Sequence, residues 1–161
     1  MLALLAHGDD AFRLVDSTDR DVGWIRQKTI GFGRFVSEDA AAAAALEGAR
    51  TLVRCLKREF GVVHLDLSDR PRVRTMRRDD AEWIVDEHVR LARLLRVTSP
   101  DGRGQEFAIE FRLPRYANQT VAINLAQIVY GALSRELTGT SGPSTMDAAT
   151  TLAGDRDATV I

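Results

Sequence analysis

Histidine and cysteine are the residues best suited to catalysis or metal binding, and the chain has three histidines and one cysteine. The cluster His7-Gly8-Asp9-Asp10 is interpreted as a solvated, frayed end, because metal ligation needs three or four convergent and supported groups. His64 falls within an alternating segment and His88 within a polar turn, so both are interpreted as ordinary surface or half-buried histidines. We therefore predict no catalytic, cofactor-binding or metal-ligating residue and no cofactor. The alternative is a small-molecule enzyme with its site between two halves of the chain and His64 or His88 as its acid–base group.

The remaining candidate motifs also favour structural roles. Cys55 lies beside the apolar stripe of an expected helix and is expected to be a core or boundary residue. Gly31-Phe32-Gly33 lacks the remaining glycines and the lysine of a phosphate-binding loop. The acidic pairs Asp79-Asp80 and Asp86-Glu87 are typical of caps and turns. None of these motifs specifies a catalytic site.

Arginine is the residue type whose distribution does suggest a ligand. Residues 50–115 carry 15 Lys or Arg against 11 Asp or Glu, and residues 70–78 are the most basic stretch. Guanidinium groups bind phosphate bidentately, so the candidate nucleic-acid contacts are Arg72, Arg74, Arg77 and Arg78. The competing interpretation, a solvated linker that Asp79-Asp80 partly neutralises, is favoured. The rings of Trp24 and Trp83 are suited to base stacking, but tryptophan in an apolar strand usually lies in the core.

The first half of the chain reads as strands followed by a helix. Residues 12–15, 22–26 and 29–35 alternate with polar turns and predict a three-stranded meander. Residues 1–6 are apolar and predict an added short strand or a frayed extension. Ser37 and the acidic residues after it mark a helix start, and the alanine-rich segment that follows has apolar residues at helical spacing, ending at Gly61.

The second half repeats this succession after a strand at 62–67 and a turn at 68–71. Residues 83–97 predict two strands around a polar turn, with Arg90 and Arg96 on one side; a helix is the alternative. Residues 105–113 alternate so regularly that positions 107, 109, 111 and 113 must share one face. Asn118 is expected to cap a second helix, whose buried stripe we predict to be Val121, Leu125, Ile128, Val129, Ala132 and Leu133.

These patterns predict an α+β fold, with two principal helices packed on one face of a mainly antiparallel sheet. Trp24-Ile25 corresponds to Trp83-Ile84, and a long amphipathic helix closes each half. We interpret residues 1–137 as a single domain of two similar strand-strand-strand-helix halves, about 11–60 and 81–137, joined by 61–80. Residues 138–161 are rich in small and polar residues and predict a flexible tail.

Charge and cysteine content narrow the function classes. A net charge of −1 excludes a globally basic nucleic-acid binder. A single cysteine fits a reducing compartment, so we predict a cytoplasmic location. No apolar run approaches the ~20 residues of a membrane-spanning helix, so no membrane partner is expected. Strand-rich halves leave sheet edges that a partner commonly covers, which predicts a homodimer.

The sequence thus predicts a non-enzymatic cytoplasmic binding or regulatory protein of unknown ligand. Its expected partner is a second copy of itself, and another protein is a second option. Nucleic acid bound through the Arg70–Arg78 segment is the less favoured alternative.

Overall fold

The computed structural model describes residues 2–60, 72–78, 81–86, 89–98, 102, 104–134 and 137. The first four strands are β1 (Ala3–Ala6), β2 (Ala11–Val15), β3 (Asp21–Arg26) and β4 (Thr29–Phe35), followed by helix α1 (Glu38–Phe60). The second four are β5 (Val73–Arg78), β6 (Ala81–Asp86), β7 (Val89–Thr98) and β8 (Gln105–Arg112), followed by helix α2 (Gln119–Leu133).

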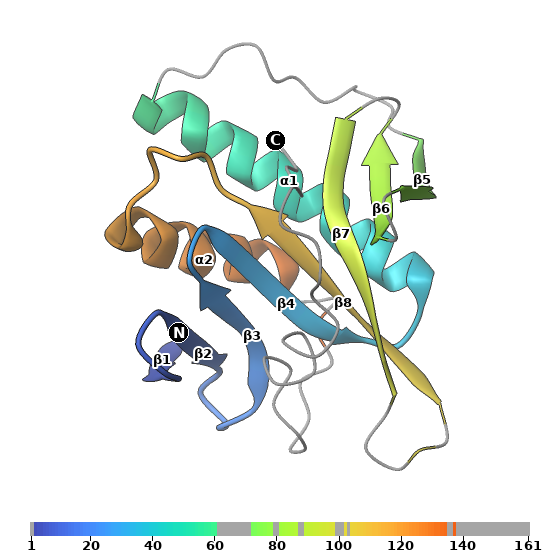
Figure 1. Ribbon diagram of the computed structural model, residues 1–161, viewed down its shortest axis with the longest axis horizontal. Helices are drawn as coiled ribbons and strands as arrows, with labels where there is room; N and C mark the ends of the chain where they lie inside the picture. The colour runs from blue at the N-terminus through green and yellow to red at the C-terminus, as the bar shows by residue number, and fades with distance from the viewer. Residues whose placement is uncertain are drawn as a thin grey trace.

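All the strands join one open antiparallel sheet in the order β1-β2-β3-β4-β8-β7-β6-β5 (Figure 1). The last strand of each half therefore lies at the centre, where β4 pairs with β8, and β1 and β5 form the two edges. The α+β class is confirmed, as is the strand interpretation of residues 83–97. Part of the expected linker, residues 73–78, is itself an edge strand. The similarity of the two halves remains a prediction.

Helix starts follow the expected capping chemistry. The Ser37 hydroxyl accepts a hydrogen bond from the amide of Ala40 at 3.1 Å, and Asn118 accepts one from the amide of Val121 at 2.9 Å. Both bonds satisfy amides that the first turn of a helix leaves unpaired. At the start of α1, Glu38 also binds Arg96 of β7, which in turn binds Glu82 of β6. The first turn of α1 is thereby joined to the sheet.

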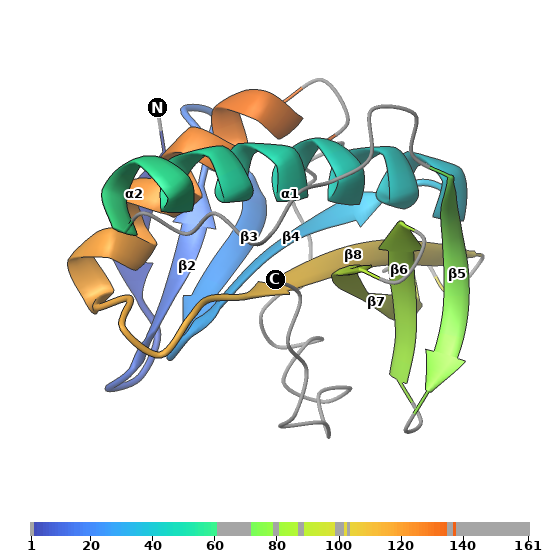
Figure 2. The same cartoon turned by 90° about the horizontal axis from the view of Figure 1, so that it is seen from above.

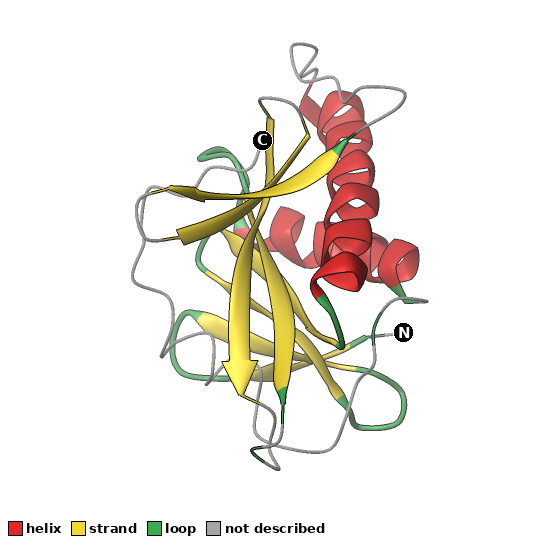
Figure 3. Ribbon diagram, turned by 90° about the vertical axis from the view of Figure 1, so that its right-hand side faces the viewer, coloured by secondary structure: helices red, strands yellow, loops and turns green. Residues whose placement is uncertain are grey.

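Both helices cover the same face of the sheet and pack against each other (Figure 3). The main core is built from buried aromatic and aliphatic side chains of β3, β4, β6, β7 and β8 and from alanines and leucines of the two helices. The first half of the helix α1 comes close to the sheet because its inner side is alanine and glycine: a Cβ on Gly48 would lie 2.5 Å from Cζ of Phe111. The alanine run is therefore a packing surface as well as a favourable helix sequence.

The sheet is bent away from the helices (Figure 2). Seen from above, β2 and β3 at one end and β5 and β6 at the other both run down and away from α1. The sheet face opposite the helices, called here the open face, therefore lies on the inside of the bend.

Three expectations from the sequence were wrong in detail. Arg90 and Arg96 do not share a side, because the β6–β7 register shifts by one residue, from Ile84 opposite Ala92 to Val85 opposite Arg90. Ile128 is 42% exposed, and α2 instead buries small residues at 122 and 126. Residues 7–10 are no frayed end but join β1 to β2, where the amide of His7 bonds to Ala11.

Several expectations lie outside the described residues. They concern the strand at 62–67, the turn at 68–71, the helix end at Gly61, the tail at 138–161, and the histidines His64 and His88.

Candidate functional site

One row of directly paired residues crosses the open face from β2 to β5. In antiparallel sheets, directly opposed residues project on the same side. The row consists of Arg13, Trp24, Gly31, Glu110, Arg93, Trp83 and Met76. Charged and aromatic side chains thus form a continuous line on the side of the sheet opposite α1 and α2.

The middle of this row is a tryptophan lying across a glycine. A Cβ on Gly31 would fall 1.9 Å from Cε2 of Trp24, so the indole occupies the space where a side chain would begin. The indole therefore reaches over β4 to β8, where its Nε1 donates to the carboxylate of Glu110 at 3.1 Å. Gly31 is the residue that permits this contact.

Glu110 is the more buried of the two carboxylates that β8 places on the open face. It is 6% exposed, and two guanidinium groups approach it: Arg93 at 3.7 Å and Arg26 at 3.9 Å. Burial raises the pKa of Glu110, while Arg93, Arg26 and the indole hydrogen bond only partly offset that effect. The carboxylate is therefore held in place by several partners, yet its charge remains costly.

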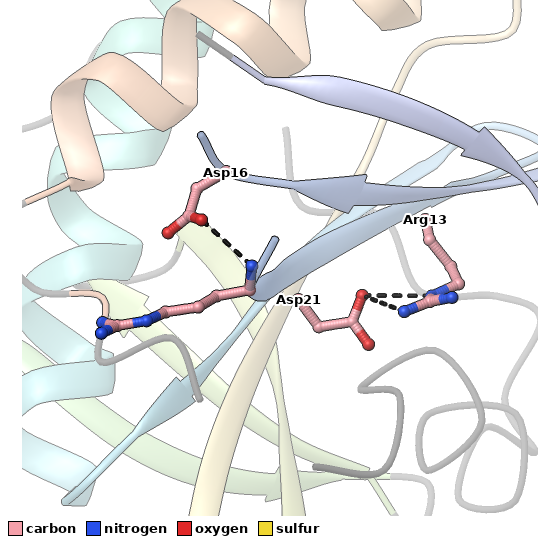
Figure 4. Close-up of polar contacts among 4 residues, drawn as sticks. Arg13, Asp16 and Asp21 are labelled. Carbon is pink, nitrogen blue, oxygen red and sulfur yellow. Dashed lines mark hydrogen bonds and ion pairs between the residues drawn. The ribbon is translucent and has the colours of Figure 1, made fainter. Parts of the chain in front are cut away.

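The β2 end of the row is an ion pair. Arg13 reaches Asp21 with its Nε at 3.1 Å and a terminal nitrogen at 3.0 Å, both on the same carboxylate oxygen (Figure 4). In the adjoining turn, Asp16 accepts from the backbone amide of Arg20 (Figure 4) and from that of Thr18. Burial raises the pKa of Asp16, but the hydrogen bonds from the Thr18 hydroxyl and from these two amides together outweigh burial and lower the pKa overall. At the β2 end of the row, both carboxylates thus have an ion-pair or hydrogen-bonding partner.

The other end of the row, around Trp83, is not satisfied. Four buried side-chain atoms of the described residues have no hydrogen bond: Asp21 Oδ2, Glu82 Oε2, Glu106 Oε2 and Trp83 Nε1. The three carboxylates still have arginine partners, namely Arg13, Arg96 and Arg34 respectively. Trp83 is fully buried, and in the described part of the chain its N–H has no acceptor at all. Such a group costs about 1–3 kcal/mol if it remains unpaired.

Arginines surround Trp83 on the open face. Arg93 is its direct neighbour on β7, and the guanidinium of Arg90 lies 5.0 Å from the centre of its ring. Val85, two residues along β6, is opposed by Arg90 on one side and by Arg74 of β5 on the other. Among described residues the arginines assigned to this face by pairing outnumber the carboxylates: Arg13, Arg26, Arg74, Arg90, Arg93 and Arg112 against Asp21, Glu106 and Glu110.

The four arginines proposed from the sequence do not form one surface. Arg72 is exposed just before β5, and Arg74 and Arg77 are exposed within it. Arg74 is opposite Val85 and Arg77 is opposite Glu82, so the two point to opposite faces of the sheet. The side chain of Arg78 lies outside the described residues. The structure instead brings Arg74 of β5 together with Arg90 and Arg93, which both belong to β7.

Sequence reasoning missed the site at Trp83 because its signals are non-local. Both tryptophans were expected to be buried, and both are 0% exposed. Among the described residues Trp24 has a hydrogen-bond acceptor and Trp83 has none, and the acceptor of Trp24, Glu110, lies 86 residues away in the chain. The alternation of residues 105–113 did place Glu110 on the polar face, but gave no sign that this face is buried.

Within the described residues, no group of three or more histidine, cysteine, aspartate or glutamate side chains is arranged to hold a metal ion. In the same part of the chain, no helix is long and apolar enough to cross a membrane. Comparison of the chain with models of protein families, with curated proteins and with solved structures finds no match.

Proposed function

We propose that this chain is a non-enzymatic binding protein and that its ligand is an anion that docks on the open face over β5, β6 and β7. The observation that carries the proposal is the fully buried N–H of Trp83, which has no acceptor among the described residues and is surrounded by arginines. A carboxylate or phosphate oxygen supplies the missing acceptor and the opposite charge at once.

Arg90 is the residue through which an anion would approach Trp83. Its side chain is half-buried and lies over the indole ring. Because arginine is long and has several rotatable bonds, it can turn toward a ligand without disturbing the sheet. The guanidinium then binds one ligand oxygen and the indole N–H another.

Nucleic acid fits this surface less well than a ligand with separate carboxylates. Neither tryptophan has an exposed ring on which a base would stack. Arg74 and Arg77 point to opposite faces, whereas a phosphate backbone lies along one surface. An enzyme using His64 or His88 is the other alternative, and both histidines lie outside the described residues.

A cytoplasmic location, a homodimeric state and the duplication of the halves belong to this proposal as well. A single cysteine supports the location, and β1, an edge strand of the described sheet, supports the dimer. The succession of four strands and a helix in each half supports the duplication.

The proposal is tested by titrating the protein with poly-L-glutamate at low salt and following heat by calorimetry. Arg90→Gln is expected to weaken binding several-fold, and Trp83→Phe to weaken it as well, because the indole N–H that would bind the ligand is removed. Arg54→Gln, an exposed arginine on α1, is the matched control and should bind as the wild type does.

Two results would contradict the proposal. The first is equal binding by the wild type, Trp83→Phe and Arg90→Gln. The second is the absence of binding by the wild type to poly-L-glutamate and to inorganic phosphate. Tighter binding of oligothymidylate than of poly-L-glutamate at the same salt would favour nucleic acid instead.

A further inference from the structure

The outer edge of β5 is the most distinctive backbone surface next to the proposed site. In the described part of the chain β5 pairs with β6 on one side and with no strand on the other. An edge strand presents unpaired N–H and C=O groups that another strand can complete. The residues of this edge are Val73, Arg74, Thr75, Met76, Arg77 and Arg78.

A second copy of β5 is a poor occupant of this edge. If two copies paired antiparallel about Thr75 and Met76, Arg74 of each would face Arg77 of the other. Like charges directly opposed across strands are destabilising. These arginines therefore disfavour pairing of β5 with a second copy of β5. The same positive charges favour pairing of β5 with an acidic strand.

We propose that the edge of β5 accepts an extended acidic segment of another polypeptide, which adds a strand to the sheet. This inference rests on the proposed function: the acidic segment is the anionic ligand, and it lies beside the open face at Trp83. Its backbone pairs with β5, and its acidic side chains lie opposite Arg74 and Arg77. Because these arginines are three residues apart, the matching acidic residues are also three apart.

The placement of the two arginines is what favours a strand as the ligand. Arg74 is on the open face, and Arg77, opposite Glu82, is on the helix-covered face. Side chains of a β-strand alternate in the same way, so one added strand presents an acid to each face. A nucleic acid, whose phosphates follow one surface, gains no advantage from this alternation.

The test uses two six-residue peptides of identical composition. The probe is acetyl-Thr-Glu-Val-Thr-Glu-Val-amide, with glutamates three apart, and its isomer is acetyl-Thr-Glu-Val-Glu-Thr-Val-amide, with glutamates two apart on one face. We expect the probe to bind about three- to tenfold more tightly, because only its glutamates can both face arginines of β5. Hydrogen exchange should slow at β5 amides when the probe is bound.

Arg77→Gln and a proline-containing peptide are the controls. In Arg77→Gln the preference for the probe over its isomer should disappear, whereas Arg54→Gln should retain it. Replacing the central valine of the probe by proline removes a backbone donor and should abolish protection of the β5 amides.

The outcomes separate this inference from the proposed function. If the probe binds in a Trp83-dependent manner but both isomers bind equally and β5 amides stay unprotected, strand addition is wrong and the open-face site stands. If neither peptide binds, while oligothymidylate does, both the strand and its acidic chemistry are overturned.

Discussion

At the residue scale, Gly31 is the position on which the open face depends most. Its missing side chain lets the Trp24 indole cross β4 and reach Glu110. Gly31→Ala is expected to destabilise the protein by at least about 3 kcal/mol, because the added methyl meets a ring that cannot move without losing its hydrogen bond. Urea unfolding measures the change.

Gly131→Ala is the matched control for Gly31→Ala. A Cβ at Gly131 meets nothing within 4 Å, and the residue lies inside α2. Alanine is the better helix former, so this variant should be up to about 1 kcal/mol more stable than the wild type. If Gly31→Ala and Gly131→Ala had the same free energy of unfolding, that result would contradict the placement of the Trp24 ring over Gly31.

Glu110 gives the protein a definite pH dependence. Burial raises its pKa in the folded state above the unfolded value, so the folded protein binds this proton more tightly than the unfolded chain does. Its contribution to stability is therefore fully present below the unfolded pKa and is lost as the pH rises through the folded pKa. Urea unfolding at several pH values should show the wild type losing stability relative to Glu110→Gln from about pH 4.3 upward. A wild-type free energy of unfolding that stays constant relative to that of Glu110→Gln, or increases relative to it as the pH rises, would contradict this.

At the element scale, the structure corrects which face of α2 is buried. Leu125 is 3% exposed and Ile128 is 42% exposed, although helical spacing placed both in one stripe. Leu125→Ala should cost about 2–5 kcal/mol, and Ile128→Ala less than about 1 kcal/mol. Thermal unfolding of the two variants side by side tests this, and equal losses would show that the helix is rotated.

Element types were readable from the sequence, whereas their tertiary neighbours were not. Alternation in residues 105–113 and caps at Ser37 and Asn118 are local signals, and β8 and both helix starts follow them. The stripe of α2 was predicted in part: Leu125, Val129 and Leu133 are buried as expected. Ile128 is exposed instead, and alanines 122 and 126 face the core, where close packing against α1 selects small side chains over larger apolar ones. The bulge between β6 and β7 has no local signal either, and it decides the position of Arg90.

The candidate site was partly predictable for the same reason. Composition pointed to arginine as the residue type of interest, and β5 contains Arg74 and Arg77 of the basic stretch. Register determines which strands adjoin it, and register arises from pairing between segments distant in the chain. Trp83 became a candidate only once its lack of an acceptor could be seen.

At the scale of the whole molecule, the two edges of the sheet differ in a way that bears on assembly. β5 carries arginines, whereas β1 consists of Ala3, Leu4, Leu5 and Ala6, and Leu5 is 45% exposed. An uncharged edge is open to pairing with a second copy. The homodimer stays a prediction, and β1 is the edge through which we expect it to form.

Light scattering at micromolar protein tests this assembly. The wild type should have twice the mass of the monomer, and Leu5→Lys, which places like charges near each other across the edge, should be monomeric. Arg77→Gln, on the opposite edge, should remain dimeric. A monomeric wild type across a hundredfold concentration range would refute the dimer, and a dimer unaffected by Leu5→Lys would place it elsewhere.

The most direct test of the central claim, that Trp83 lies in an anion-binding site, uses the two indole N–H signals of the chain in ¹⁵N-resolved NMR. Trp83→Phe assigns them, since the chain has two tryptophans. On titration with poly-L-glutamate, the Trp83 signal should move downfield as its N–H gains an acceptor, while the Trp24 signal, already bonded to Glu110, should stay nearly fixed. A Trp83 signal that does not move at saturating ligand, or moves no more than that of Trp24, would contradict the claim.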